Sequence, residues 1–164
     1  MNLNDFVIAD RSGLTVRFND KKMANLEDLL NTMLNHPPTV DYFLERLYFV
    51  RDNRRNSAVM DAYIEKELGG YWEEEYLKDH GLEYGWFSFF SYNLGGEVYT
   101  DHFIETIYII NDYVSEQPVT EIPFNEFISI FEQYKKSSEA FLAFRSLPWW
   151  KRLTQRWKGF VPGK

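Results

Sequence analysis

The sequence predicts a mainly α-helical single domain, a helical bundle with a short N-terminal β-hairpin. The first observation behind this prediction is the segment 124–144, where apolar residues recur at alternating spacings of three and four through roughly five helical turns. The second is the segment 6–18, where partial alternation of apolar residues flanks a turn at 11–13. The third is the length of 164 residues without a low-complexity linker, which indicates one domain over 1–164. An α+β fold with a small sheet is the alternative.

The central helix is expected over Pro123–Phe144. Proline in the first turn loses no hydrogen bond, because the first N–H groups of a helix have no partner within it. A helix this long and one-sided needs a surface to lie on, so we take it as the centre of the core. The residues expected to face that core are Phe124, Phe127, Ile128, Phe131, Tyr134, Phe141 and Leu142.

Four further helices are expected earlier in the chain, over residues 25–34, 39–48, 57–68 and 72–79. The expected N-caps of the first three are Asn25, Thr39 and Ser57. The fourth opens with three glutamates, Glu73, Glu74 and Glu75, which complement the positive end of the helix dipole.

Two segments in the middle of the chain have patterns that suit either a helix or a strand. Residues 84–92 hold six aromatic side chains in nine residues and are predicted as a strand. Residues 99–114 repeat apolar side chains at Phe103, Ile107, Ile110 and Val114, which predicts a nearly buried helix. Residues 108–111 alone would also pass for a strand.

The composition indicates a soluble protein of a reducing compartment. The chain has no cysteine, so neither disulfides nor thiolate metal sites are available. Its first ten residues lack the basic start and apolar run of a secretory signal, and the longest apolar runs are far too short to span a membrane. We therefore expect a cytoplasmic location. The sequence does not indicate an oligomeric state.

The net charge of −7 conceals a strong asymmetry. Residues 145–164 carry six basic residues and no acid, whereas residues 1–144 carry 12 basic and 25 acidic ones, a net charge of −13. The most acidic window lies between Lys78 and Lys135, where 56 residues contain ten acids and neither lysine nor arginine. Such a field attracts cationic partners and opposes the approach of nucleic acid.

Residues 145–158 are expected to form a basic, tryptophan-rich terminal helix, followed by a loose tail over 159–164. We expect its apolar side to dock onto the acidic body of the same chain. A surface for a partner is the second possibility, and binding to nucleic acid or lipid is opposed by the charge of the body. The side chains that share the apolar side are Trp149, Trp150, Leu153 and Trp157.

Two groups of polar residues could carry chemistry, and both are better explained as solvated surface. Asp101, His102 and Glu105 could supply metal ligands, but a metal site needs three or four converging ligands. The three glutamates 73–75, with Asp79 and His80, could supply an acid/base pair, but consecutive helical residues point in different directions. We therefore expect no catalysis, no cofactor and no metal.

The acidic window and the aromatic run within it predict a surface for a basic protein. Carboxylates speed the encounter with a cationic partner, and exposed rings anchor it afterwards. Ten acids without a base cost self-repulsion, which a purely solubilising surface avoids by mixing both signs. The expected partner-binding residues are Glu73, Glu74, Glu75, Asp79, Glu83, Asp101, Glu105, Asp112, Glu116, Tyr84 and Trp86.

The acids from Asp79 to Glu132, the glutamates 73–75 and the aromatic run Tyr84–Tyr92 come together in a small chain without an active-site motif. In these features the chain resembles the immunity proteins of bacterial toxin systems, notably those of contact-dependent growth inhibition. The resemblance implies a non-enzymatic, cytoplasmic protein that binds one cognate toxin domain, often a basic nuclease, and blocks it. The basic segment from Arg145 departs from a simple acidic inhibitor.

Other functions stay open on the sequence alone. A nucleic-acid mimic that inhibits a restriction or defence enzyme would need the acids to form a duplex-like double row. A carboxylate-based hydrolase would need two or three acids to converge in a pocket. A structural subunit would be held through the tryptophan-rich end.

Overall fold

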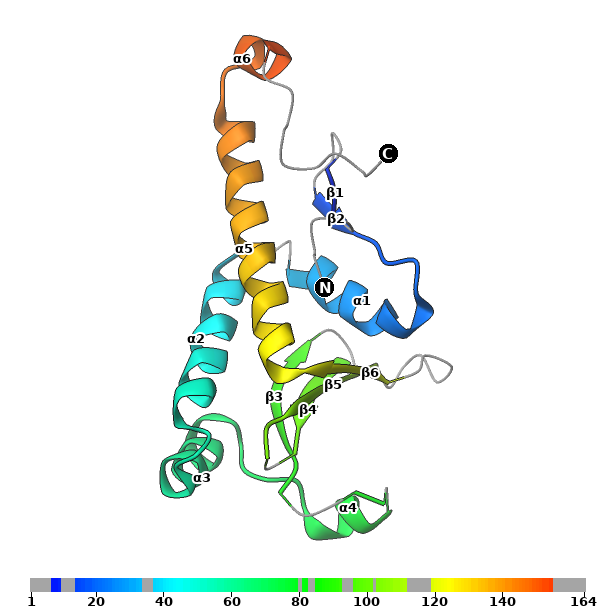
Figure 1. The fold of residues 1–164 in the computed structure, drawn as a ribbon, viewed down its shortest axis with the longest axis vertical. Coiled ribbons are helices and arrows are strands. Elements are labelled where there is room, and N and C mark those ends of the chain that lie inside the picture. Colours follow the sequence, from blue (N-terminus) through cyan, green and yellow to red (C-terminus); the bar gives the residue numbers. More distant parts are fainter. Residues whose placement is uncertain are drawn as a thin grey trace.

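In the computed structural model, the described residues are 7–9, 14–33, 37–79, 81–82, 85–92, 96–101, 103–111 and 119–154. They form a two-stranded sheet, a four-stranded sheet and a set of helices (Figure 1). The elements in chain order are β1 (Val7–Ala9), β2 (Leu14–Val16), the 3-10 turn η2 (Lys21–Met23), α1 (Ala24–Met33), α2 (Pro37–Asn53), α3 (Ser57–Glu67), α4 (Glu74–Asp79), β3 (Phe87–Tyr92), β4 (Gly96–Thr100), β5 (Thr106–Asn111), β6 (Thr120–Pro123), α5 (Phe124–Ser146) and α6 (Trp149–Thr154).

The four-stranded sheet is antiparallel with the order β3-β4-β5-β6, and it makes the fold α+β. The prediction of a mainly α-helical bundle is therefore wrong, and the α+β alternative describes the chain. The error lies in residues 99–114, which form the end of β4 and all of β5 where a helix was expected. Strand β5 buries Ile107 and Ile109 on one face and half-buries Tyr108 and Ile110 on the other. Because both faces carry apolar side chains, the alternation that identifies a strand is lost.

A tight turn between β4 and β5 also excludes the expected helix. The carboxylate of Asp101 accepts hydrogen bonds from the backbone N–H groups of Phe103 and Ile104, both at 3.0 Å. Ile104 has a positive φ of 54°, which an α-helix does not contain and which a β-branched residue rarely adopts. The turn therefore depends on Asp101 holding two backbone donors.

Several other elements are confirmed. Strands β1 and β2 pair antiparallel, with Val7 opposite Val16, as expected for the N-terminal hairpin, whose turn at 10–13 lies outside the described residues. The aromatic run forms β3 over Phe87–Tyr92, and the long central helix forms α5 over Phe124–Ser146.

The expected N-caps are wrong. Asn25 lies within α1 and is buried, and its side-chain amide donates to the carbonyl of Ile109 on β5 at 2.9 Å. Thr39 lies inside α2, which begins at Pro37. The cap of α3 is Asn56, whose side chain accepts from the N–H of Val59, while Ser57 is the first helical residue.

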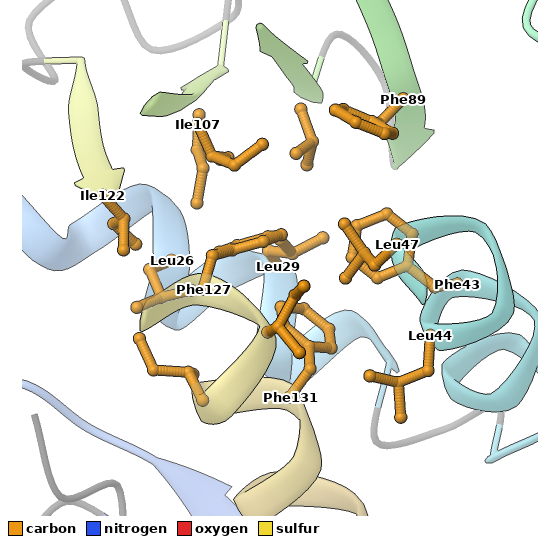
Figure 2. Packing of buried hydrophobic residues seen from close by; sticks show 14 of the residues in the cluster. Leu26, Leu29, Phe43, Leu44, Leu47, Phe89, Ile107, Ile122, Phe127 and Phe131 are labelled. Atoms are coloured by element: carbon orange, nitrogen blue, oxygen red, sulfur yellow. The ribbon is translucent and has the colours of Figure 1, made fainter. Parts of the chain in front are cut away.

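The core lies between the four-stranded sheet and the helices α1, α2 and α5, which cover one face of that sheet, here called the inner face (Figures 1 and 2). Phe127 and Phe131 of α5 lie beside Phe43 of α2, with ring centroids 5.9 Å and 4.9 Å from that of Phe43. Ring contacts of this kind add about 0.5–1.5 kcal/mol to the free energy of apolar burial. Leu142, expected on the same face of α5, is 51% exposed, because the last turns of α5 extend past the sheet (Figure 1).

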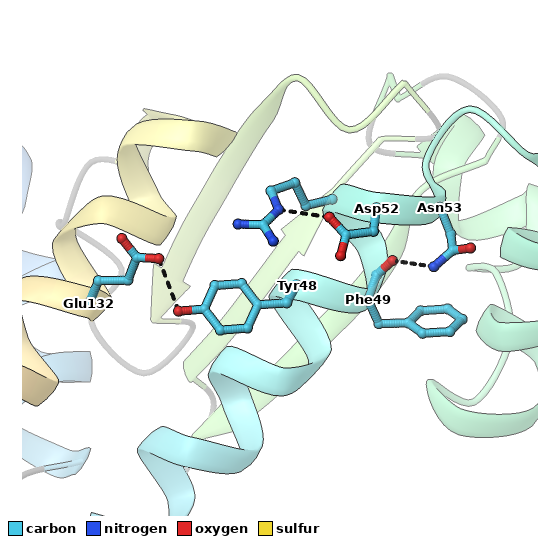
Figure 3. A network of polar contacts seen from close by, with 6 residues as sticks. Tyr48, Phe49, Asp52, Asn53 and Glu132 are labelled. Carbon is cyan, nitrogen blue, oxygen red and sulfur yellow. Dashed lines mark hydrogen bonds and ion pairs between the residues drawn. The ribbon is translucent and has the colours of Figure 1, made fainter.

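Polar contacts join α2 to α5 at the margin of the core. The hydroxyl of Tyr48 donates to the carboxylate of Glu132 at 2.9 Å (Figure 3), and Lys135 pairs with Asp41 at 2.6 Å. These groups are partly exposed, so they contribute less to stability than the rings beneath them.

Phe131 provides the first test of this core. Phe131→Ala should lower the free energy of unfolding by about 3–5 kcal/mol, because the ring is fully buried and its loss leaves a cavity. Leu142→Ala on the exposed end of α5 is the control and should change it by less than about 0.5 kcal/mol. Urea unfolding followed by circular dichroism measures both, and a loss below about 1 kcal/mol for Phe131→Ala would contradict this description of the core.

The stability should also fall in alkaline solution because of buried tyrosines. The hydroxyl of Tyr134 donates to the carbonyl of Leu30 at 3.1 Å, and burial raises the pKa of Tyr134 above its ordinary value of 10.0. Above pH 10 the unfolded chain ionises this group while the folded chain keeps it neutral, so the stabilisation present below pH 10 is lost as the pH rises. Tyr134→Phe should therefore reduce the slope of unfolding free energy against pH above about pH 10. Identical slopes for the two proteins would contradict this assignment.

Candidate protein-binding surface

The second face of the four-stranded sheet, here called the outer face, carries polar and aromatic side chains in register. Ser88 lies opposite Tyr99, Tyr99 opposite Tyr108, and Tyr108 opposite Glu121, so one row crosses all four strands. Directly opposite residues share a face, and these alternate with the residues that the inner face buries. The rings of Tyr99 and Tyr108 stack with centroids 5.4 Å apart. The outer face therefore has an aromatic centre.

Helix α4 and the residues before it cover one end of the outer face (Figure 1). Two consecutive glycines with positive φ, Gly69 at 84° and Gly70 at 90°, turn the chain after α3. This turn brings Trp72 onto the sheet, where its backbone N–H donates to the carbonyl of Trp86 at 2.8 Å. Its indole lies 4.9 Å from the ring of Tyr99, measured between centroids. The aromatic centre thus continues from the sheet to α4.

A hollow of about 530 Å³ opens beside Trp72. The described residues that line it are Gly69, Tyr71, Trp72, Glu73, Tyr76 and Glu97. We call it the Trp72 hollow. Three of its residues are aromatic and two are acids, and none of the six is basic.

Hydrogen bonds fix the side chains of the Trp72 hollow. The indole Nε1–H of Trp72 donates to the hydroxyl of Ser88 at 3.2 Å, and that hydroxyl donates to the carboxylate of Glu97 at 3.3 Å. The hydroxyl of Tyr71 donates to Asp61 at 2.6 Å. The indole of Trp72 and the ring of Tyr76 form an edge-to-face pair with centroids 5.3 Å apart. The hollow is therefore preorganised.

The structure places the predicted binding residues in three groups. Glu73 lines the Trp72 hollow, while Glu75 and Asp79 are exposed on α4. Glu74 is also exposed, but it pairs with Lys78 at 2.9 Å, and the hydrogen bond from Lys78 lowers the pKa of Glu74. These four acids lie together at the end of the molecule that α4 occupies (Figure 1).

The second group lies at the β4–β5 turn. The carboxylate of Asp101 holds that turn, and Glu105 is exposed beside it. A guanidinium N–H of Arg54 donates to the carbonyl of Ile104 at 3.4 Å, which brings a positive charge to this end of the sheet. Burial raises the pKa of Tyr108, and the charges of Asp101 and Glu121 raise it further.

The third group contains Trp86, which is buried where an exposed ring was expected, and four residues that lie outside the described part of the chain. Trp86 is only 8% exposed, and it packs beneath the surface against Tyr99 and Tyr108 at centroid distances of 5.5 Å and 5.0 Å. It supports Tyr99, which is equally buried, and the half-buried Tyr108, and it is not an exposed ring itself. Glu83, Tyr84, Asp112 and Glu116 lie outside the described residues.

Sequence reasoning missed the rings that flank the acids of α4. Tyr71, Trp72 and Tyr76 bracket the glutamates 73–75 in the string YWEEEY, which is a local signal for an acidic and aromatic surface. Glu97 was counted in the acidic window but not among the binding residues. Its position in the hollow follows from the pairing of β4 with β3, which places Glu97 opposite Ser91 and within hydrogen-bond distance of Ser88.

A second hollow, of about 440 Å³, lies near α1 and mainly serves structure. Its polar residues hold β2 and the following chain on α1. Asn31 accepts from the N–H of Val16 at 2.9 Å and donates to its carbonyl at 3.0 Å, and Glu27 accepts from the N–H of Phe18 at 2.8 Å. The outer face and α4 are therefore the candidate binding surface.

Metal chemistry finds no support in the described part of the chain, where no three His, Cys, Asp or Glu side chains are grouped to hold a metal ion. His80 and His102, which the two candidate polar groups contain, lie outside that part.

No helix among the described residues combines the length and apolar character that crossing a membrane requires.

Helix α6 does not pack its described tryptophans as expected. Trp149 is 67% exposed and Trp150 is 54% exposed, and the helix lies at the opposite end of the molecule from α4 (Figure 1). The structure therefore gives no support to docking of these two side chains on the acidic body. Trp157 lies outside the described residues.

No protein-family model matches the chain, and neither the curated proteins nor the solved structures gave a significant match. The function is therefore argued from the surface itself.

The two kinds of tryptophan should differ in their contribution to stability. Trp86→Ala should lower the free energy of unfolding by about 3–5 kcal/mol, since it removes the buried ring on which Tyr99 and Tyr108 rest. Trp149→Ala should change it by less than about 0.5 kcal/mol, because that side chain is mostly exposed. Denaturant unfolding compares them, and similar losses for both variants would contradict the placement of α6.

Proposed function

We propose that this protein is a non-enzymatic inhibitor that binds a basic protein, in the manner of an immunity protein that binds its toxin. The binding surface is the outer face of the sheet together with α4. The observation that carries the proposal is the combination, on one surface, of ordered rings with carboxylates on strands that contain no lysine or arginine. Two basic residues reach the margins of this surface: Lys78, which pairs with Glu74 on α4, and Arg54, which reaches the β4–β5 turn.

Charge supports the first step of binding. Residues 79–134, which supply the whole four-stranded sheet, contain neither lysine nor arginine, and the acids Glu97 and Glu121 lie on its outer face. A surface of one sign steers an oppositely charged partner and raises its association rate by about 10- to 1000-fold at low ionic strength. The proposed partner is therefore a strongly basic domain, and a nuclease domain has this character.

The rings support the second step. Tyr76 is 44% exposed and the ring of Trp72 is partly exposed, and both are held in place by neighbouring groups. Aromatic side chains that are already ordered bury a large area at a small entropic cost, which slows dissociation. Steering by charge and retention by rings are the two properties that a tight inhibitor needs.

The arrangement favours a protein partner over mimicry of nucleic acid. A mimic needs carboxylates in rows that replace phosphates, whereas the described acids of the outer face are separated by tyrosine rings. We therefore retain the basic protein as the proposed partner.

A charge-reversal pair tests the proposal. Glu75→Lys with Glu121→Lys changes the binding surface, and Glu45→Lys with Glu139→Lys changes the exposed side of α2 and α5 by the same net charge. The partner is the basic domain encoded beside the gene, or one captured from lysate of the source cell, and its association rate is measured from about 50 mM to about 500 mM NaCl. The first variant should associate at least about tenfold more slowly at low salt, and the difference should shrink as salt rises.

The second variant controls for net charge and should associate nearly as the original protein does. Equal slowing of both variants would show that total charge, and not this surface, drives the encounter. Unchanged binding and inhibition by the first variant would contradict the proposed surface outright.

A further inference from the structure

The Trp72 hollow is a concave site large enough to admit one long side chain. Its volume of about 530 Å³ is bordered by residues from four parts of the chain: the turn after α3, the segment that leads into α4, α4 itself, and β4. A long side chain that projects from a partner fits such a space better than a flat contact does.

The aromatic walls of this hollow suit a flat cation. Trp72 is fixed by a backbone hydrogen bond to Trp86, by its indole N–H on Ser88 and by ring packing on Tyr99. A guanidinium that stacks on a ring already in place gains cation–π attraction without ordering the ring first.

The two carboxylates add charge to these walls. Glu97 is half-buried and oriented by the hydroxyl of Ser88, and Glu73 stands at the rim in solvent. A half-buried carboxylate attracts a cation more strongly than a fully solvated one, because less water screens the pair. The same carboxylates disfavour an anionic ligand, and an apolar ligand would desolvate them without compensation.

We propose that the Trp72 hollow binds a single arginine side chain presented by the basic partner. This inference rests on the proposed function, which supplies a basic protein as the ligand, and it adds the chemical identity of one contact. Arginine is favoured over lysine because its guanidinium is planar, stacks on aromatic rings and donates to two carboxylate oxygens at once. Lysine offers only a compact, strongly hydrated charge.

The test uses a capped pentapeptide with one central arginine between glycine and serine residues. Titration into the 15N-labelled protein should shift the indole N–H signal of Trp72, with a dissociation constant on the order of 1–10 mM. The same peptide with citrulline keeps the shape and loses the charge, and it should not shift that signal. The lysine peptide should bind at least about threefold more weakly.

Variants locate the binding. Glu97→Gln and Tyr76→Ala should each weaken binding of the arginine peptide by at least about threefold, one through charge and the other through the ring. Glu45→Gln is the matched control, because this exposed carboxylate lies on α2, outside the proposed binding surface and outside the hollow. It should bind the arginine peptide as the original protein does.

The outcomes separate this inference from the proposed function. Equal shifts with the arginine and citrulline peptides, or equal weakening by Glu97→Gln and Glu45→Gln, would overturn the arginine site. If association of a basic partner depends on Glu75 and Glu121 but the arginine peptide does not bind, the proposed function stands and the arginine site is wrong. Peptide binding without a charge-dependent partner supports the site and contradicts the function.

Discussion

The packing of α5 against the inner face of the sheet is the interaction on which the rest of the structure depends. Phe127 lies between Phe43 of α2 and the strand residues Ile107 and Ile122, and Phe131 lies beside Phe43 farther from the strands (Figure 2). One stripe of side chains on α5 thus joins α2 to the sheet, and α1 packs on the same face beside it. Because a strand shifted by one residue would turn these isoleucines away from α5, the same packing fixes strand register. Register in turn decides which residues reach the outer face.

The parts of the fold that could be predicted from the sequence are those with a local cause. The stripe of α5 repeats over many turns, and β3 is marked by consecutive aromatic residues, so both were found. Strand β5 was missed because apolar side chains occupy both its faces, one against the core and one under the aromatic centre. The cap predicted at Asn25 is wrong because the partner of its side chain, the carbonyl of Ile109, lies 84 residues away and leaves no signal in the local sequence.

The same distinction separates the predicted from the unpredicted parts of the candidate site. The exposure of Glu73, Glu74, Glu75 and Asp79 follows from composition, since charged side chains without partners in the core stay in water. The Trp72 hollow could not be derived in this way, because Glu97 reaches it only through the pairing of β3 with β4. The prediction for Trp86 is wrong in the opposite direction, because exposure was expected and the side chain is buried. An aromatic residue in an aromatic run gives no sign of the face on which it lies until the strands are paired.

Side chains alternate between the two faces along each strand, so most residues that a partner could contact on the outer face are not the residues that form the core. Glu121 is exposed and precedes the buried Ile122, so this acid is replaceable without disturbing the core beside it. The Trp72 hollow is the exception, because Trp72 both lines it and packs on Tyr99 in the small cluster of Leu77 and Trp86. Changes at the rim therefore adjust the charge seen by a partner at little structural cost. A change at Trp72 would alter the packing on Tyr99 and the wall of the hollow together, so a substitution there cannot separate a loss of binding from a loss of structure.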